Sequence, residues 1–336
     1  MTTDTSKNPY KWIQKELETL DPYVDYENIY RLVTCYGTND FINNLIYTLI
    51  FPNFVVWEWG ARVVWREDGG KVFGSATARV EETQTKNDTW WWHGPSDPRT
   101  QKSVEIINQR HAYWNKRYPG DFAHNEDYVY TLAFSAVFMH RLRLRPGLSG
   151  VPEKVKIANY LFMTDMGKLF YSLTPDGSHV PLKDWPVDFD GLIAYCEIVE
   201  NADKPGSDQG HMIASAIYEH FAFRWFSPPF RWLGRAISKS LSLPSTLATH
   251  RIQPPNPILK WLILTVSGWL LWLMEMFGPD PTVAFLPEWE QMPKDKMAER
   301  KKEQNGIDRR FSEYFAAMPQ NQGMGCPFQM TMKMKN

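Results

Sequence analysis

The sequence predicts an all-α protein, because apolar residues recur at a helical period along nearly the whole chain. No segment alternates polar and apolar residues for long enough to build a sheet, and no internal repeat is visible. No linker-like change of composition divides the chain before its Gln- and Met-rich end. We therefore expect an N-terminal helical extension over residues 1–39, one all-α domain over 40–318 and a flexible tail over 319–336.

The individual elements follow from apolar periodicity and from helix breakers. An apolar stretch over 41–51 ends at Pro52. The segment 86–100 is predicted to be a turn-rich insert, and it contains Trp90, Trp91 and Trp92, to which the sequence assigns no role. The remaining helical segments are expected at 74–85, 103–115, 125–141, 152–173, 188–201, 208–226, 257–277 and 294–318.

The composition argues against some classes of function. Lys and Arg number 37 and Asp and Glu number 38, so a net charge of −1 provides no basic surface for duplex nucleic acid. In contrast, the chain carries 15 Trp, 15 Tyr and 19 Phe, which is more flat apolar surface than the core of a 336-residue chain needs. We therefore expect a lipophilic small-molecule partner and no nucleic-acid partner.

The N-terminal residues and the cysteines indicate an intracellular protein. Residues 1–18 are polar and contain no apolar core behind a basic head, so we expect no signal peptide. Cys35, Cys196 and Cys326 are widely spaced and odd in number, which is a poor disulfide framework. We expect a cytoplasmic location or a location on the cytoplasmic face of a membrane.

Peripheral membrane contact is expected through residues 220–277. The uncharged run 261–274 has 14 residues, fewer than the ~20 that a membrane span needs, and it indicates a buried or interfacial helix. Upstream, the stretch 220–239 interleaves aromatic residues with Arg and Lys, as expected at the headgroup boundary. A core helix pair whose Arg side chains extend to solvent explains the same pattern equally well.

Residues that could support chemistry are few. The sequence lacks the usual motifs of P-loop and dinucleotide binding, of serine hydrolases and of zinc proteases, and it has no C-x-x-C pair. Arg79 and Thr83 remain, four residues apart and therefore on one helix face, together with His111. His111 shares an apolar helix face with Val104 and Trp114.

His111 and Arg79 each allow two interpretations. A single histidine on an apolar helix face suits a haem-binding protein, because neutral imidazole ligates iron while apolar side chains shield the porphyrin. A core histidine with one hydrogen bond has the same pattern, and Arg79 is equally well explained as a salt-bridge partner. No D-D-x-x-D-like cluster is present, which argues against a diphosphate-dependent terpenoid cyclase but not against a lipophilic substrate.

Three short motifs resemble a known family by their order and spacing. They are Arg79-Val-Glu-Glu-Thr83, then Ile107-Asn-Gln-Arg-His111-Ala with its His 28 residues after Thr83, and Asn125-Glu-Asp-Tyr-Val-Tyr-Thr-Leu-Ala133. This pattern resembles the rubber oxygenase (latex clearing protein) family and its fungal relatives, typified by the membrane-bound oxygenase of mycophenolic acid biosynthesis. The resemblance covers roughly residues 40–225.

The resemblance implies a globin-like helical fold that holds a b-type haem inside the 40–318 catalytic domain. It implies that His111 is the axial iron ligand and that Arg79 and Thr83 lie near the haem, where they support its binding and the distal pocket. It also implies that dioxygen cleaves a carbon–carbon double bond of an isoprenoid chain in secondary metabolism. We therefore expect a haem-dependent oxygenase with a lipophilic prenylated or terpenoid substrate.

Two alternatives stay open at this point. One is an oxygen-independent cyclase or isomerase built on the same scaffold. The other is a non-catalytic helical protein that binds lipid at a membrane surface.

Overall fold

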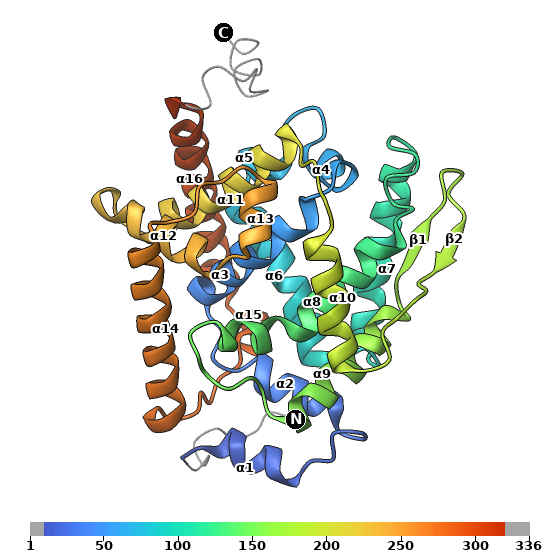
Figure 1. Cartoon of the computed structure of the whole chain (residues 1–336), viewed down its shortest axis with the longest axis vertical. Coiled ribbons are helices and arrows are strands. Elements are labelled where there is room, and N and C mark those ends of the chain that lie inside the picture. Colours follow the sequence, from blue (N-terminus) through green and yellow to red (C-terminus); the bar gives the residue numbers. More distant parts are fainter. Residues whose placement is uncertain (1–9, 320–336) are drawn as a thin grey trace. The chain divides into compact units, whose positions relative to one another are not determined.

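The structure is a computed structural model that describes residues 10–319, and these residues form an all-α fold, as predicted (Figure 1). Sixteen α-helices make up nearly all of the regular structure in this range, beside two short 3₁₀ helices, η2 and η3. One antiparallel hairpin accompanies them, in which β1 (Tyr171–Leu173) pairs with β2 (His179–Pro181). The expected tail lies outside the described residues, apart from residue 319.

The described residues divide into two compact units whose segments interleave along the sequence. Unit 1 comprises residues 10–39, Thr85–Ala202 and Leu264–Gln291, and unit 2 comprises Asp40–Gln84, Asp203–Ile263 and residues 292–319. Helices α6 (Ala76–His93) and α14 (Pro257–Phe277) each contribute residues to both units. The expected boundaries at 39/40 and 318/319 remain predictions.

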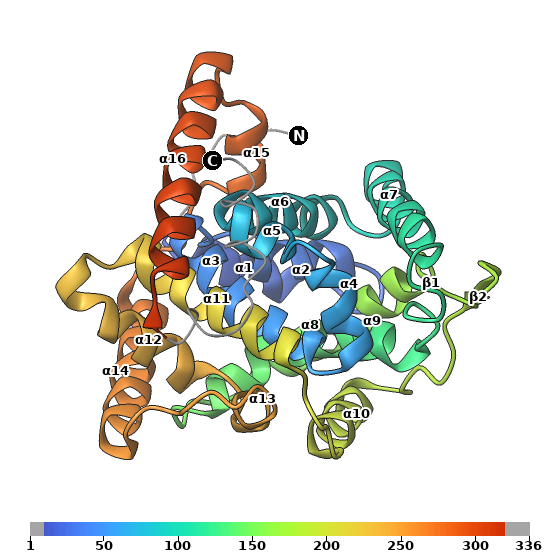
Figure 2. The same ribbon diagram turned by 90° about the horizontal axis from the view of Figure 1, so that it is seen from above.

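Unit 1 is built around α8, which packs against α9 on one side and α10 on another. Helix α2 packs on α9, where Tyr30 stacks on Phe162 with ring centroids 3.8 Å apart. Helix α7 lies beside β1, as Figure 2 shows. The unit contains α1 (Trp12–Thr19), α2 (Tyr26–Thr34), α7 (Pro98–Asn115), α8 (Asn125–Leu144), α9 (Glu153–Gly167), α10 (Phe189–Asn201) and α15 (Phe285–Glu290).

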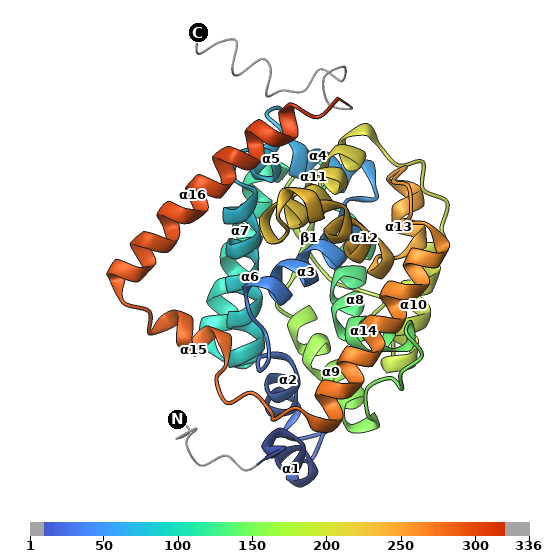
Figure 3. The ribbon, with the colours of Figure 1, turned by 90° about the vertical axis from the view of Figure 1, so that its left-hand side faces the viewer.

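Unit 2 is organised by α11, a nearly fully buried helix that packs against α3, α4, α12 and α16. Its core gathers Val55, Phe73, Ile213, Phe311 and Phe315 with neighbouring apolar side chains. Figure 3 shows α16 in red, with α5 at its C-terminal end. The unit contains α3 (Asp40–Ile50), η2 (Phe51–Val55), α4 (Glu58–Trp65), α5 (Gly70–Gly74), α11 (Asp208–Trp225), η3 (Pro228–Phe230), α12 (Arg231–Leu241), α13 (Pro244–Thr249) and α16 (Lys294–Ala316).

The N-terminus of α6 is capped from a distant part of the chain. Asp308 of α16 accepts hydrogen bonds from the backbone N–H of Thr77, at 2.6 Å, and of Ala78, at 3.4 Å. These are two of the amide groups that a helix leaves unpaired at its first turn. Asp308 is buried, so α16 supplies an internal cap that stabilises the start of α6.

The prediction of a turn-rich insert at 86–100 is wrong for its first half, because α6 continues to His93 and Trp90–Trp92 are helical. No Gly or Pro interrupts this stretch before Gly94, which adopts a positive φ of 80° and begins the turn. Trp91 is buried, and the Trp90 indole donates to Ser103 at 3.0 Å. The Trp run therefore belongs to the packing of unit 1.

The predicted end of one further helix also differs. The helix expected to reach residue 173 ends at Gly167, and the next residues turn into the hairpin. Gly177 at the hairpin tip has a positive φ of 89°, which suits a tight turn. Three-residue strands are too short for the alternation of polar and apolar residues to identify them in the sequence.

Candidate functional site

The three predicted site residues fall in both units. Arg79 and Thr83 lie one turn apart on the part of α6 that belongs to unit 2, and His111 lies near the end of α7 in unit 1. The structure thus confirms the helical placement of all three, and the surroundings of each are described within its own unit.

His111 is held in an aromatic setting. Its ring centroid lies 4.9 Å from that of Phe122, and its Nδ1 lies 3.4 Å from the hydroxyl of Tyr128. Tyr128 comes from α8, in the third of the motifs that carry the family resemblance. Burial lowers the pKa of His111 to about 4, so the imidazole is neutral at pH 7.

The ring of His111 has one nitrogen to spare. Within residues 10–319, no hydrogen bond to Nε2 is present, and the contact at Nδ1 is longer than a usual N–H···O bond. In the tautomer in which Nδ1 donates to the Tyr128 oxygen, Nε2 carries the lone pair. Histidines that ligate metals are commonly arranged in this way, with the second nitrogen oriented by a hydrogen bond, so His111 fits a haem iron. A core histidine with a single hydrogen bond accounts for the same contact.

The contacts of Arg79 do not match the interpretation of this residue as a salt-bridge partner. In the described part of the chain it forms no ion pair, and its guanidinium instead lies over the ring of Phe51, 5.0 Å from the centroid. Its Nε is buried without a hydrogen-bond partner. A buried unpaired donor on a charged group is costly, so Arg79 fits an anionic group such as a carboxylate.

Tyr47 and Asn43 of α3 extend this set of unpaired polar groups. Both are buried and lie one turn apart, and neither the Tyr47 hydroxyl nor the Asn43 amide has a hydrogen-bond partner. Tyr47 stacks on Phe51 and lies near Arg79, whose positive charge opposes the rise in the pKa of Tyr47 that burial causes. Unit 2 therefore holds buried donors and acceptors, from α3 and α6, that lack partners within the protein.

Thr83 has a simpler setting. Its hydroxyl donates to the backbone carbonyl of Arg79 at 2.9 Å, which is the common hydrogen bond of a helical threonine to the residue four positions earlier. The Thr83 oxygen can still accept a hydrogen bond.

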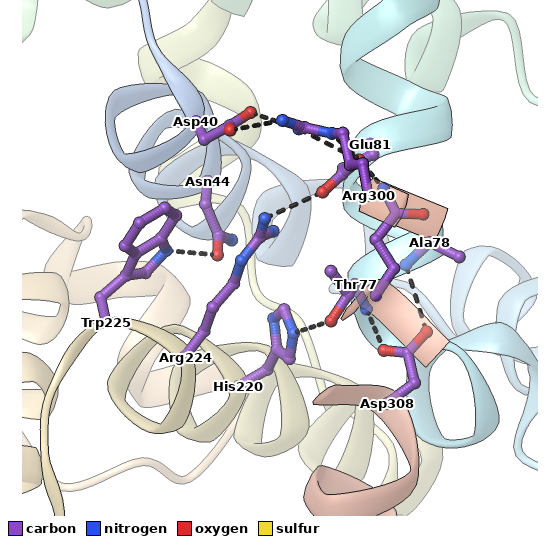
Figure 4. A network of polar contacts seen from close by, with 11 residues as sticks. Asp40, Asn44, Thr77, Ala78, Glu81, His220, Arg224, Trp225, Arg300 and Asp308 are labelled. Atoms are coloured by element: carbon purple, nitrogen blue, oxygen red, sulfur yellow. Dashed lines mark hydrogen bonds and ion pairs between the residues drawn. The ribbon is translucent and has the colours of Figure 1, made fainter. Parts of the chain in front are cut away.

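A buried ionic network surrounds Glu81 of α6, and Figure 4 shows Glu81 with Arg224, Arg300 and Asp40. No local sequence pattern predicts this network. Glu81 accepts from Arg224 of α11 at 2.8 Å and pairs with Arg300 of α16 at 3.2 Å. Arg300 also pairs with Asp40 of α3 at 2.6 Å. Burial raises the pKa of Glu81, and the two guanidinium groups oppose that rise. The network joins α3, α6, α11 and α16 in unit 2.

His220 lies beside this network and is accounted for by its own contacts. Its Nε2 is 3.0 Å from the Thr77 hydroxyl, and burial lowers the pKa of His220 to about 3. The ring is therefore neutral, and it is hydrogen-bonded to Thr77 (Figure 4). These are the properties of an ordinary core histidine.

The basic residues of the 220–239 stretch mostly serve the interior of unit 2. Arg224 pairs with Glu81, and Arg235 donates to Glu219 at 2.6 Å. The guanidinium of Arg231 lies 4.3 Å from the ring centroid of Phe223. These contacts place the guanidinium groups inside unit 2 rather than in solvent, whereas Phe230 and Trp232 of the same stretch are exposed. Membrane contact through 220–277 stays a prediction.

His93 is a second histidine with a spare nitrogen. It lies at the C-terminal end of α6 in unit 1, is buried, and its Nε2 has no hydrogen-bond partner. Burial lowers the pKa of His93, so it too is neutral at pH 7. The sequence does not mark His93 as a candidate site residue, because it precedes Gly94-Pro95 in a segment predicted to be a turn-rich insert.

Comparison with known proteins does not assign a family. No protein-family model matches the chain, and no curated protein matches it. Among residues 10–319, no three His, Cys, Asp or Glu side chains are grouped in a way that could hold a metal ion. The resemblance to the rubber oxygenases therefore rests on the three motifs alone.

Proposed function

We propose that this chain is a haem-dependent oxygenase that cleaves or oxidises a carbon–carbon double bond of a lipophilic prenylated or terpenoid substrate. The observation that carries the proposal is the setting of His111, neutral at pH 7, with Nδ1 at the Tyr128 hydroxyl and Nε2 unpaired. The order and spacing of the motifs around Arg79, Thr83 and His111 support it.

Each of the three residues has a distinct part in this proposal. His111 supplies one protein ligand to a b-type haem, and Tyr128 holds the ligand's ring in position. The resemblance assigns Arg79 to haem binding, and its buried Nε without a partner would suit an anionic group such as a carboxylate. Thr83 offers its hydroxyl oxygen as an acceptor near the same turn of α6. A bound haem would supply the reaction with dioxygen, and the protein would supply binding, orientation and exclusion of water.

Haem binding is the first test. The purified full-length chain is mixed with haem, unbound haem is removed by gel filtration, and the absorption spectrum of the protein fraction should show a Soret band that corresponds to one haem per chain. The His111→Ala variant should lose this band and regain it in excess imidazole, because the free ligand fills the vacated position. The matched control is His124→Ala, which removes a partly exposed histidine of the same unit that pairs with Glu126 at 3.5 Å.

The competing ligand is tested in the same way. If His93→Ala abolishes the Soret band and His111→Ala does not, the ligand is His93 and the assignment to His111 is wrong. Absence of a Soret band in the wild-type chain after haem is supplied would overturn the proposed function and favour the lipid-binding alternative.

Activity separates the oxygenase from the isomerase. Cleavage of one double bond by one dioxygen molecule gives two carbonyl groups, each of which takes one oxygen atom, so labelled dioxygen should appear in both products. A product that forms equally well in anaerobic buffer would instead identify an oxygen-independent cyclase or isomerase.

A further inference from the structure

Helix α14 exposes an unusual amount of apolar surface. Eleven of its 21 residues are large hydrophobic side chains that face solvent, among them Trp261 at 65% exposure, Trp269 at 61% and Met274 at 69%. It is also the one helix within the described residues that is long and apolar enough, by length and composition, to cross a membrane. It is drawn in orange in Figures 1 and 3.

The exposed side chains cover one broad face of the helix. At 100° per residue, they occupy roughly 220° of the circumference, from the direction of Trp261 round to that of Met274. The two charged residues of the helix, Lys260 and Glu275, lie outside this arc. The arc forms a strip about 30 Å long that carries no charged residue, with Thr265 as a polar side chain within it and Ile263 buried near its edge.

The opposite face of α14 is attached to the protein. Gly268 is buried so closely against Pro146 that a Cβ at this position would lie 2.7 Å from the proline Cβ. Glu275 pairs with Arg143 of α8. Both contacts lie within unit 1, and they hold the helix lengthwise along the protein surface.

The C-terminal end of the helix carries side chains suited to a lipid headgroup region. Lys11 donates to the carbonyl of Glu275 at 2.6 Å, and the Tyr10 hydroxyl donates to that of Met276 at 3.3 Å. Lys and Tyr combine an apolar stem with a polar tip, which suits the boundary between water and acyl chains. Phe277 is exposed beside them.

We propose that the exposed face of α14 binds the surface of a phospholipid bilayer, with the helix lying in the plane of the membrane. A protein partner is a poorer fit, because protein interfaces form about one hydrogen bond per 100–200 Å² and this strip offers few polar groups besides indole N–H. Acyl chains require no hydrogen bonds, and tryptophans are typical of membrane interfaces. If α14 crossed the membrane, its packing against Pro146 and its Arg143–Glu275 ion pair would both have to break. These two contacts therefore oppose a membrane-spanning orientation.

Vesicle binding tests the proposal. The full chain is sedimented with phosphatidylcholine vesicles in the absence of detergent, and we expect wild type to partition into the pellet. The double variant Trp269→Glu/Leu273→Glu changes the centre of the exposed arc and should lower the partition coefficient about a hundredfold, since two apolar side chains are lost from the contact. The matched control is Val187→Glu/Ile198→Glu, at two strongly exposed positions of unit 1 outside α14, which should bind like wild type.

Depth and folding complete the test. Lipids brominated near the carbonyl end of the acyl chain should quench the fluorescence of Trp269, obtained as the difference from Trp269→Phe, more than lipids brominated near the methyl end. Stronger quenching from the methyl end would overturn the in-plane orientation. Circular dichroism and thermal unfolding verify that the variants fold, and neither readout requires the membrane or a bound haem.

Two other results would overturn the proposal. The first is equal partitioning of the wild type and the double variant. The second is a wild-type dimer that binds no vesicles and becomes monomeric in the double variant, because the occupant of the strip would then be a second copy of the chain.

Discussion

The protonation of His111 leads to a quantitative prediction. Its pKa is about 4 in the folded protein, against 6.5 for an unperturbed histidine, because burial disfavours the charged form. A histidine whose folded pKa is depressed favours folding in its neutral form. The stability that this preference provides is present above pH 6.5 and is lost as the pH falls toward 4. Linkage gives a loss of about 2 kcal/mol between pH 7.5 and pH 5.

The perturbation is His111→Gln, which keeps a neutral polar side chain but removes the titration. Urea unfolding of wild type and variant at pH 7.5 and pH 5 gives four free energies of unfolding, and wild type should lose about 2 kcal/mol more than the variant. Other buried histidines, such as His220 and His250, contribute equally to both proteins and cancel. If wild type and variant change in parallel, His111 is not the buried neutral group described above.

The same pKa bears on the cofactor. Neutral imidazole is the form that binds iron. Haem binding through His111 should therefore persist from pH 7 to pH 5.5, whereas a solvent-exposed histidine ligand would lose about tenfold in affinity over that range. Acid-sensitive release of haem above pH 5.5 would contradict the assignment of His111 as the ligand.

Three further changes have clear expectations. Glu81→Gln should lower the free energy of unfolding by about 3 kcal/mol, because it leaves Arg224 buried with a weaker partner. The control Glu82→Gln breaks an exposed pair with Lys71 and should lower it by less than about 1 kcal/mol. Equal effects of the two variants in urea unfolding would contradict the stabilising role of the buried pair. Tyr47→Phe should change apo stability by less than about 1 kcal/mol, because the hydroxyl forms no well-aligned hydrogen bond with its polar neighbour, the Arg79 guanidinium, but should weaken haem binding in a titration. Gly268→Val should destabilise by about 1–3 kcal/mol in thermal unfolding through its clash with Pro146, and an unchanged Tm would show that α14 is not packed there.

Helix positions were largely predictable because local signals mark their ends. The α10 helix begins after Asp188 and α11 after Ser207, whose side chains accept from the backbone N–H of Gly191 and Gly210. The α14 helix has its predicted limits, with Pro257 at its start. The Trp90–Trp92 run was misassigned because a Trp-rich segment rich in polar residues lacks a clear helical stripe, and tertiary packing keeps it helical.

The site was predictable only in part, since its partners are remote in sequence. The apolar helix face identified His111, but its contact with Tyr128 depends on how α7 packs against neighbouring residues of unit 1. The Glu81 network joins residues 143 to 260 positions apart, and no local pattern predicts such pairing. Likewise, no sequence feature predicts that Arg79 forms no ion pair within the described residues.

The cap that Asp308 provides has a consequence for synthesis. The chain emerges from the ribosome N-terminus first, and the first turn of α6 receives its acceptor 231 residues later, when α16 has been made. Until then the leading amides of α6 depend on water, and α11 lacks one of the helices that cover it. Unit 2 therefore completes its folding late, and a nascent chain that stops before α16 will present the apolar surfaces of α5 and α11 to chaperones.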